Sequence, residues 1–254
     1  MKMQSKVEQM MMNAWPALHT VDYDGWKVCF ASGFTKRANA VYPLHDIAGD
    51  QNDWAGKIGA VERMYAMQGL PSIFKMTDEP RLSLLDQQLS VNGYEKEGAT
   101  AVLTCSLGQV AEPAKQTVEM TMQPTARWLA RYAEMSGSSK MDMAIMQQML
   151  ARIEKPACFV ILYEGDQDVA CGYAVLEDGY TGLYSIVTSP AYRNQGYGEQ
   201  LVLNLLKWAK LSGASEAYLA VVQDNAPAVR LYSKVGFTDA YRYWYRLKSA
   251  ATLS

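Results

Sequence analysis

The chain has 254 residues, 49% of them hydrophobic, so it is long enough for one large domain or two smaller ones with packed cores. Its formal net charge of −2, with both signs interspersed, argues against a nucleic-acid-binding protein, and we expect no nucleic-acid partner. Residues 1–15 contain Lys2, Lys6 and Glu8 and lack the apolar core of a secretory signal. No apolar run has the length of a membrane span, so we expect a cytoplasmic protein without a membrane partner.

The first half of the sequence predicts helices and strands in alternation. Hydrophobic spacing predicts helices over 1–13, 53–68 and 79–91, and strands over 18–23, 25–31, 38–44, 73–76 and 99–107. Asn92-Gly93 ends the last of these helices, because glycine accepts the left-handed conformation at a helix end. The segment Glu112-Pro113-Ala114-Lys115 is the expected linker to the second half.

The second half predicts a strand over 183–187, a loop, an amphipathic helix, a strand over 216–222, a short helix and a final strand over 241–247. The amphipathic helix has Leu201, Leu205 and Trp208 on one face, and Gly213 follows its end. Asn225 is the expected N-cap of the short helix, with Pro227 in its first turn.

The loop before the amphipathic helix reads Arg193-Asn194-Gln195-Gly196-Tyr197-Gly198. Backbone N–H groups at a helix N-terminus attract phosphate, and glycines let the backbone approach a ligand closely. By itself the loop favours a tight strand-to-helix turn over a phosphate site, because short glycine motifs occur frequently without a ligand.

Metal or cysteine chemistry is not expected. The chain has only two histidines, His19 and His45, both remote in sequence from the glycine loop, and no paired C-x-x-C spacing. The four cysteines lie far apart in apolar, strand-like surroundings, where we expect buried free thiols in a reducing compartment: Cys29, Cys105, Cys158 and Cys171.

Together, the glycine loop and the run Asn225…Ala228…Leu231-Tyr232…Gly236-Phe237 resemble a GNAT-family N-acetyltransferase domain over roughly residues 117–248. The segment Gly33-Phe34-Thr35-Lys36-Arg37 through Leu44 is similar to the start of some bacterial two-GNAT proteins. The resemblance implies an α/β (α+β) fold of tandem GNAT-like domains, each a mixed, largely antiparallel sheet flanked by helices. We expect domains at 1–112 and 117–254.

The resemblance also implies acetyl transfer from the co-substrate acetyl-CoA, without a metal, to a primary amine of a small molecule or of a peptide or protein, by direct attack in a ternary complex. It assigns the pantetheine arm and acetyl carbonyl to the backbone of Ile186, Val187 and Thr188. It assigns the pyrophosphate to Arg193, Asn194, Gln195, Gly196, Tyr197 and Gly198. Asn225 either orients the co-substrate or caps its helix. Tyr232 is the expected general acid for the departing thiolate.

The N-terminal half is expected to be a degenerate copy. Leu85–Tyr94 aligns with Ala228–Phe237 at an offset of 143 residues (236 − 93), and both segments read as helix, glycine stop and aromatic residue. Leu89 then stands where the second copy has Tyr232 and cannot donate a proton. The acidic residues Asp46, Asp50 and Asp53 replace the glycine loop and would repel a pyrophosphate.

Four questions stay open from the sequence alone. The general base is not identified, because Glu164, Glu177 and Asp178 at predicted strand ends are equally well explained as solvated charges. Aromatic residues such as Tyr184, Tyr241, Tyr243 and Trp244 fit either an acceptor pocket or the core. A non-catalytic acyl-CoA sensor or scaffold is the alternative function, and a homodimer is left open.

Overall fold

The structure is a computed structural model and describes residues 3–44 and 54–249. The chain forms two compact units whose segments alternate along the sequence. Unit 1 comprises Met1–Pro16 and Val102–Ala240, and unit 2 comprises Ala17–Ala101 and Tyr241–Ser254. Within the described residues, no helix combines the length and the apolar character needed to cross a bilayer.

This division differs from the expected boundary between 1–112 and 117–254. The N-terminal helix α1 (Met3–Ala14) belongs to unit 1. Strand β5 (Glu95–Ser106) begins in unit 2 and ends in unit 1, whereas β11 (Thr238–Lys248) begins in unit 1 and ends in unit 2. The physical reason is that strand pairing overrides sequence order, because the strands of each unit include part of a strand from the other half of the chain.

Unit 1 contains a mixed sheet in the order β5-β10-β9-β8-β7-β6. The strands β6 to β9 are antiparallel to one another, whereas β10 is parallel to β9. The strand bounds are Val118–Thr121 for β6, Ala157–Glu164 for β7, Gln167–Glu177 for β8, Tyr180–Thr188 for β9 and Glu216–Val222 for β10.

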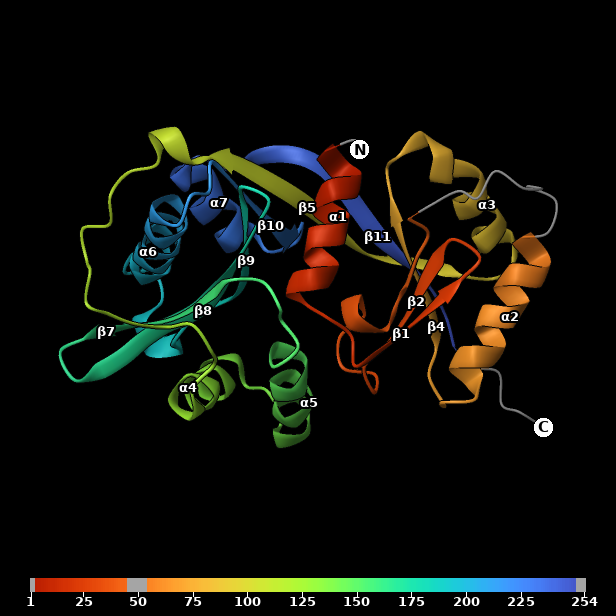
Figure 1. The fold of residues 1–254 in the computed structure, drawn as a ribbon, viewed down its shortest axis with the longest axis horizontal. Helices are drawn as coiled ribbons and strands as arrows, with labels where there is room; N and C mark the ends of the chain where they lie inside the picture. The colour runs from red at the N-terminus through yellow and green to blue at the C-terminus, as the bar shows by residue number, and fades with distance from the viewer. Residues whose placement is uncertain (1–2, 45–53, 250–254) are drawn as a thin grey trace. The chain divides into compact units, whose positions relative to one another are not determined.

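Helices cover both faces of this sheet. Figure 1 shows α6 and α7 on one side of β7, β8 and β9, with α4 and α5 on the other. Their bounds are Ala126–Ser136 for α4, Lys140–Leu150 for α5, Tyr197–Leu211 for α6 and Ala226–Val235 for α7. Thr125 caps α4 by accepting from the Trp128 N–H, and Ser139 forms a capping box with Asp142 at the start of α5.

Aromatic side chains form the core on the α4 side. Tyr173 stacks on Phe159 with ring centroids 5.0 Å apart and on Tyr184 at 5.2 Å. Trp128 of α4 meets Phe159 edge-on at 5.1 Å, and its indole N–H donates to the carbonyl oxygens of β7 and β8. The Tyr173 hydroxyl donates to the carbonyl of Ala14 at 3.1 Å, which fastens the end of α1 to this core.

The expected linker is a fixed part of unit 1. The Lys115 N–H donates to the Gln200 side chain at 2.9 Å, and the Lys115 carbonyl accepts from Asn204 at 2.7 Å. Asn204 is only 2% exposed, so its amide is committed to this contact. The segment therefore holds α6 in place.

The four cysteines are free and buried, as the sequence predicts. Burial raises the pKa of Cys29 to about 11 and the pKa of Cys158 and Cys171 each to about 12. Because the thiolate is the reactive form, these thiols are poor nucleophiles at neutral pH.

Unit 2 contains β1, β2, β3, β4 and the end of β11 in that order. The final strand pairs with β4 antiparallel, from Tyr243–Thr77 to Lys248–Ser72. The bounds are His19–Tyr23 for β1, Trp26–Phe30 for β2, Val41–Tyr42 for β3, Ser72–Thr77 for β4, Trp54–Ala66 for α2 and Ser83–Val91 for α3. Ile58, Tyr65, Phe74 and Leu89 are fully or almost fully buried in its core.

The predicted elements occur with two main differences. The segment predicted as a strand over 38–44 starts with a 3-10 turn at Arg37–Asn39, and only Val41–Tyr42 are strand. The buried Asn39 causes this, because its side chain bonds the backbone of Ala31, Gly33, Phe34 and Thr35 and folds the chain into a turn. Strand β5 starts at Glu95, earlier than predicted.

The two aligned segments end alike: Gly93 after α3 has φ +80° and Gly236 after α7 has φ +109°. Leu89, aligned with Tyr232, is fully buried in the unit 2 core. Asp46, Asp50 and Asp53 lie outside the described residues.

A charged contact fastens the end of β11 to α3 within unit 2. Arg246 donates to both oxygens of Asp86 at 2.9 and 2.8 Å, and the Trp244 indole N–H donates to the same carboxylate at 2.7 Å. Burial alone would raise the pKa of Asp86, but these hydrogen bonds and the Arg246 charge outweigh it and lower the pKa below its usual range.

We expect Asp86→Ala to destabilise the protein by about 3 kcal/mol, because it leaves a largely buried guanidinium without its counter-ion. The folded-state pKa of Asp86 is lowered, so this stability is fully present above the unfolded carboxyl pKa of about 3.9. It is lost as the pH falls from there through the lower pKa of the folded state. Urea unfolding at several pH values measures the effect. Asp22→Ala, which removes an exposed ion pair with Lys27, is the control and should cost less than about 1 kcal/mol.

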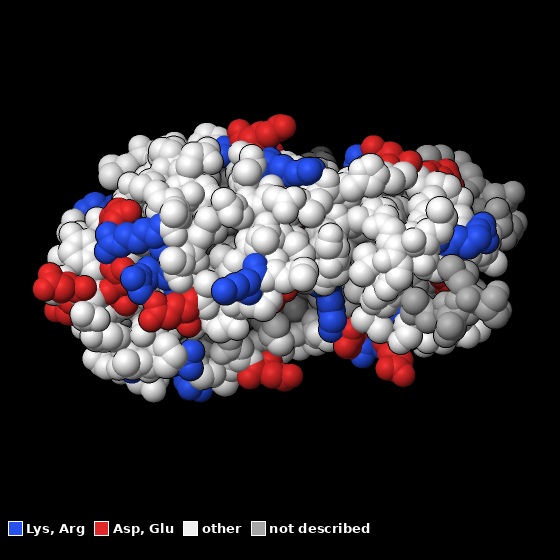
Figure 2. Space-filling view, turned by 90° about the horizontal axis from the view of Figure 1, so that it is seen from below, with Lys and Arg blue, Asp and Glu red and all other residues white. Residues whose placement is uncertain are grey.

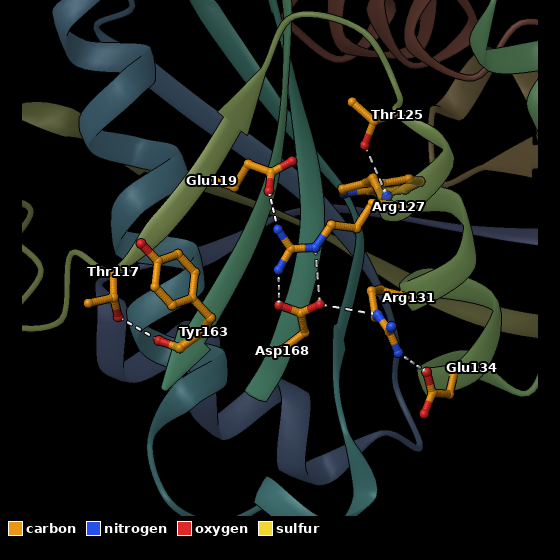
Figure 3. A network of polar contacts seen from close by, with 9 residues as sticks. Thr117, Glu119, Thr125, Arg127, Arg131, Glu134, Tyr163 and Asp168 are labelled. Atoms are coloured by element: carbon orange, nitrogen blue, oxygen red, sulfur yellow. Dashed lines mark hydrogen bonds and ion pairs between the residues drawn. The ribbon is translucent and has the colours of Figure 1, made fainter. Parts of the chain in front are cut away.

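A second charged network joins α4 to β6 and β8 of unit 1. Figure 3 shows Arg127 between Asp168 of β8 and Glu119 of β6, with Arg131 on the same Asp168 carboxylate. The Asp168 side chain is 10% exposed, accepts a hydrogen bond from Arg127 at 2.6 Å and forms an ion pair with Arg131 at 3.1 Å. We interpret this network as structural.

The surface carries charges of both signs. On the face drawn in Figure 2, acidic and basic side chains of the described residues lie in small mixed groups.

Candidate active site

The central feature of unit 1 is a fork between two parallel strands. Pairing between β9 and β10 is limited to three positions, Tyr180–Glu216, Thr181–Ala217 and Gly182–Tyr218. Strand β9 nevertheless continues to Thr188 and β10 to Val222. Beyond Gly182 the backbone of β9 is therefore free of its parallel neighbour and faces the opening.

A β-bulge lies at the start of this opening. Tyr184 pairs with Tyr173 and Val187 with Cys171, so β9 has one residue more than β8 between these pairs. Ser185 adopts φ +53° there, in the left-handed region. Opposite the bulge, a Cβ on Gly172 would lie 2.6 Å from the terminal methyl of Ile186, so any larger residue there would force that side chain to move. The bulge redirects Ile186, Val187 and Thr188 into the opening.

Two tyrosines meet where the strand pairing stops. The hydroxyls of Tyr184 and Tyr218 are 2.9 Å apart in a buried hydrogen bond. Both side chains lie over Gly182, where a Cβ would be 2.6 Å from each hydroxyl oxygen. The missing side chain of Gly182 thus makes room for the pair that fills the base of the fork.

The predicted phosphate loop opens α6 as the sequence indicates. Gly196 is the N-cap with φ +85°, and no side chain caps the helix there. Asn194 also lies in the left-handed region at φ +59°. The first N–H groups of α6 therefore lack a side-chain acceptor and point to where an anion can bind.

Gly198 brings the two helices of the site together. A Cβ at this position would lie 2.9 Å from Leu231 of α7 and 3.2 Å from the Thr188 hydroxyl. Glycine therefore lets the first turn of α6 pack against both the end of β9 and α7.

Tyr232 lies on α7 with its ring 9% exposed. Its ring meets Phe237 with centroids 6.0 Å apart, and its hydroxyl has no hydrogen-bond partner among the described residues. Burial raises the pKa of Tyr232 to about 12. The phenol is therefore neutral over the physiological range and keeps its proton as a hydrogen-bond donor.

These elements surround one cleft of about 660 Å³. Ten of the eleven predicted site residues line it: Ile186, Val187, Thr188, Arg193, Asn194, Gly196, Tyr197, Gly198, Asn225 and Tyr232. The Gln195 side chain does not, because its amide donates to the Ala191 carbonyl at 3.1 Å. Asn225 caps α7 by accepting from the Ala228 N–H at 3.2 Å.

Five further lining residues were missed by the sequence analysis: Tyr192, Glu199, Pro227, Ala228 and Leu231. Helical spacing could have found part of this set. Ala228 lies four residues before Tyr232 and therefore on the same face of α7, and Glu199 lies in the first turn of α6. Their position beside the loop depends on how the two helices pack.

Two of the carboxylates considered as general bases, Glu177 and Asp178, are paired with other side chains. Glu177 accepts from Asn13 at 2.9 Å and pairs with Lys155 at 3.1 Å. Asp178 pairs with Lys6 at 3.7 Å. Both lie near the start of β9, about 20 Å along the strand from Ile186, the first residue of β9 that lines the cleft, at about 3.3 Å per residue. They are therefore too far from the cleft for direct proton transfer.

Three of the four aromatic candidates for an acceptor pocket make contacts outside the cleft. Tyr184 fills the base of the fork, the Trp244 indole bonds Asp86, and the Tyr243 ring lies 4.0 Å from the Lys75 ammonium. Among the described residues, no group of three or more histidine, cysteine, aspartate or glutamate side chains could hold a metal ion.

A mixed sheet that forks between two parallel strands, with a glycine loop opening the helix that follows β9, is the fold of the GNAT acetyltransferases. The family model described as "Probable histone acetyltransferase Rv0428c C-terminal" matches residues 5–246, and the chain belongs to this family.

Relatives and solved structures agree with this assignment. The chain is 28% identical to an uncharacterized N-acetyltransferase, YobR, of Bacillus subtilis, over 96% of this chain and 98% of that protein. It resembles the solved structure of a GCN5-related N-acetyltransferase from Kribbella flavida, with a TM-score of 0.75 and 14% identity over 100% of this chain and 98% of that one. A tandem GNAT protein from the clavulanic acid biosynthesis pathway gives a TM-score of 0.63 and 12% identity over 82% of this chain and 73% of that chain.

Proposed function

We propose that this protein transfers an acetyl group from acetyl-CoA to a primary amine of a small molecule or a peptide, by direct attack in a ternary complex. The observation that carries the proposal is the cleft itself. It combines a free strand edge, an uncapped helix N-terminus with two glycines, and a protonated tyrosine.

Each wall of the cleft has a chemical role in this proposal. Backbone N–H groups of Gly196, Tyr197 and Gly198 bind the diphosphate, which accepts hydrogen bonds at the positive end of α6. The freed backbone after the bulge, at Ile186 and Val187, pairs with the pantetheine amides. A backbone N–H there also stabilises the negative charge that develops on the acetyl carbonyl oxygen.

The reaction needs one proton removed and one supplied. The amine nitrogen attacks the carbonyl carbon, the carbon–sulfur bond breaks, and the thiolate leaves. An alkyl ammonium has a pKa near 10.4 in water, so the amine must lose its proton to water or to a group outside the carboxylates described above. Tyr232, with a pKa of about 12, stabilises the departing thiolate as a hydrogen-bond donor.

We expect Gly196→Asp to abolish the stabilisation by acetyl-CoA, because it adds a negative charge where the diphosphate binds. Gly196→Asn is the matched control. Asparagine has nearly the same shape as aspartate and tolerates the left-handed conformation, but it adds no charge. Thermal unfolding with acetyl-CoA or free CoA at 100 times Kd should show about 2.7 kcal/mol of stabilisation in the wild type. Lack of any shift in the wild type would contradict the proposed co-substrate.

A further inference from the structure

An ion pair joins the two helices that border the cleft. The Lys234 ammonium of α7 lies 2.6 Å from the Glu199 carboxylate of α6. Glu199 lines the cleft and its side chain is 22% exposed, whereas the Lys234 side chain is 69% exposed. Lys234 follows Leu231 by three residues, so both lie on the face of α7 that meets the first turn of α6.

The position of Glu199 conflicts with an anionic ligand. Glu199 is the acidic residue in the first turn of α6, beside N–H groups without a side-chain cap. An acidic side chain at that position stabilises an empty helix N-terminus. A diphosphate bound at the same N-terminus would experience repulsion from the carboxylate, because both charges are negative and close together.

The other cations near the loop do not cancel this charge. Lys115 pairs with Glu164 and lies over the Tyr197 ring, 5.1 Å from its centroid. Arg193 is exposed, and its Nε donates to the Thr188 carbonyl at 3.4 Å. Among the ion pairs of the described residues, Lys234 is the partner of Glu199.

We propose that Lys234 is a further binding residue of this site, which enables diphosphate binding by neutralising Glu199. The inference rests on the proposed acetyl-CoA site. Lys234 contacts the Glu199 carboxylate, so its loss is expected to lower the affinity for the co-substrate.

The test measures acetyl-CoA dissociation constants by titration calorimetry for the wild type, Lys234→Met, Glu199→Gln and the double variant. Lys234→Met should weaken binding on the order of 5-fold at low salt, from Coulomb interactions of exposed charges in water. Glu199→Gln alone should not weaken binding. The double variant should bind within about 2-fold of the wild type, because the charge that repels the diphosphate and the charge that offsets it are removed together.

Lys210→Met is the matched control, since it removes one exposed positive charge near the other end of α6. The effect of Lys234→Met should shrink at about 1 M salt, where the screening length is only about 3 Å. Binding by Lys234→Met equal to that of the control would overturn the inference. So would a loss of affinity that Glu199→Gln does not restore. A wild-type protein that binds no acetyl-CoA would overturn the proposed function and this inference with it.

Discussion

A fragment of residues 117–254 is expected not to fold, although it spans the whole predicted acetyltransferase domain. Unit 1 would lose Met1–Pro16 and its residues 102–116. The missing stretches contribute these largely or fully buried side chains: Val7, Met10, Met11, Ala14, Val102, Leu103, Cys105 and Leu107. Six of these are large aliphatic side chains worth roughly 1.5–3 kcal/mol each, so the loss is comparable to the whole of the typical 5–15 kcal/mol of net stability.

The fragment would also expose apolar surface of its own. Strand β11 would lack β4, its partner from Ser72 to Thr77, and would present Tyr243 and Tyr245 to solvent. An unpaired strand with apolar side chains promotes aggregation. We therefore expect the fragment to be insoluble or to lack a cooperative unfolding transition by circular dichroism.

Two further chains make this test decisive. Coexpression of residues 1–112 with residues 113–254 should restore a soluble complex, because every strand then has its partner. A chain that ends at residue 249 should unfold like the full-length protein, since β11 ends at Lys248. A soluble monomeric 117–254 fragment with cooperative unfolding would show that unit 1 does not depend on the N-terminal half.

Replacement of Tyr232 by phenylalanine is expected to lower the turnover number by about 100-fold, within the range typical of a lost acid–base group. The affinity for acetyl-CoA should remain nearly unchanged, because the ring and its contact with Phe237 are kept and the hydroxyl has no partner among the described residues. Steady-state kinetics combined with calorimetric binding separates the two quantities. Equal turnover in the variant would remove Tyr232 from the mechanism.

The pH profile gives a second measure of the same residue. Burial raises the pKa of Tyr232 to about 12, so the proton donor is present at all lower pH values and is lost only as the pH rises through that value. The wild-type rate should therefore not decline between about pH 8 and 10 through ionisation of a phenol with the ordinary pKa near 10. Tyr232→Phe should lower the rate by a similar factor throughout that interval.

The sequence alone determined the local parts of this protein. The loop from Arg193 to Gly198 and the helix from Ala226 to Val235 depend on glycine conformations and an Asn225 cap, which residues within one turn specify. Ten predicted site residues consequently line one cleft, whereas the Gln195 side chain points elsewhere, because its amide finds a backbone acceptor on the preceding turn.

Only the tertiary structure decided how distant segments combine. The fork depends on where Gly182 and Tyr218 stop pairing, and the bulge at Ser185 depends on Gly172 in the neighbouring strand. Strand pairing also divides β5 and β11 between the two units, so that each strand begins in one unit and ends in the other. No local pattern encodes these contacts, because hydrogen bonds between strands and ion pairs such as Glu199–Lys234 join residues that only packing brings together.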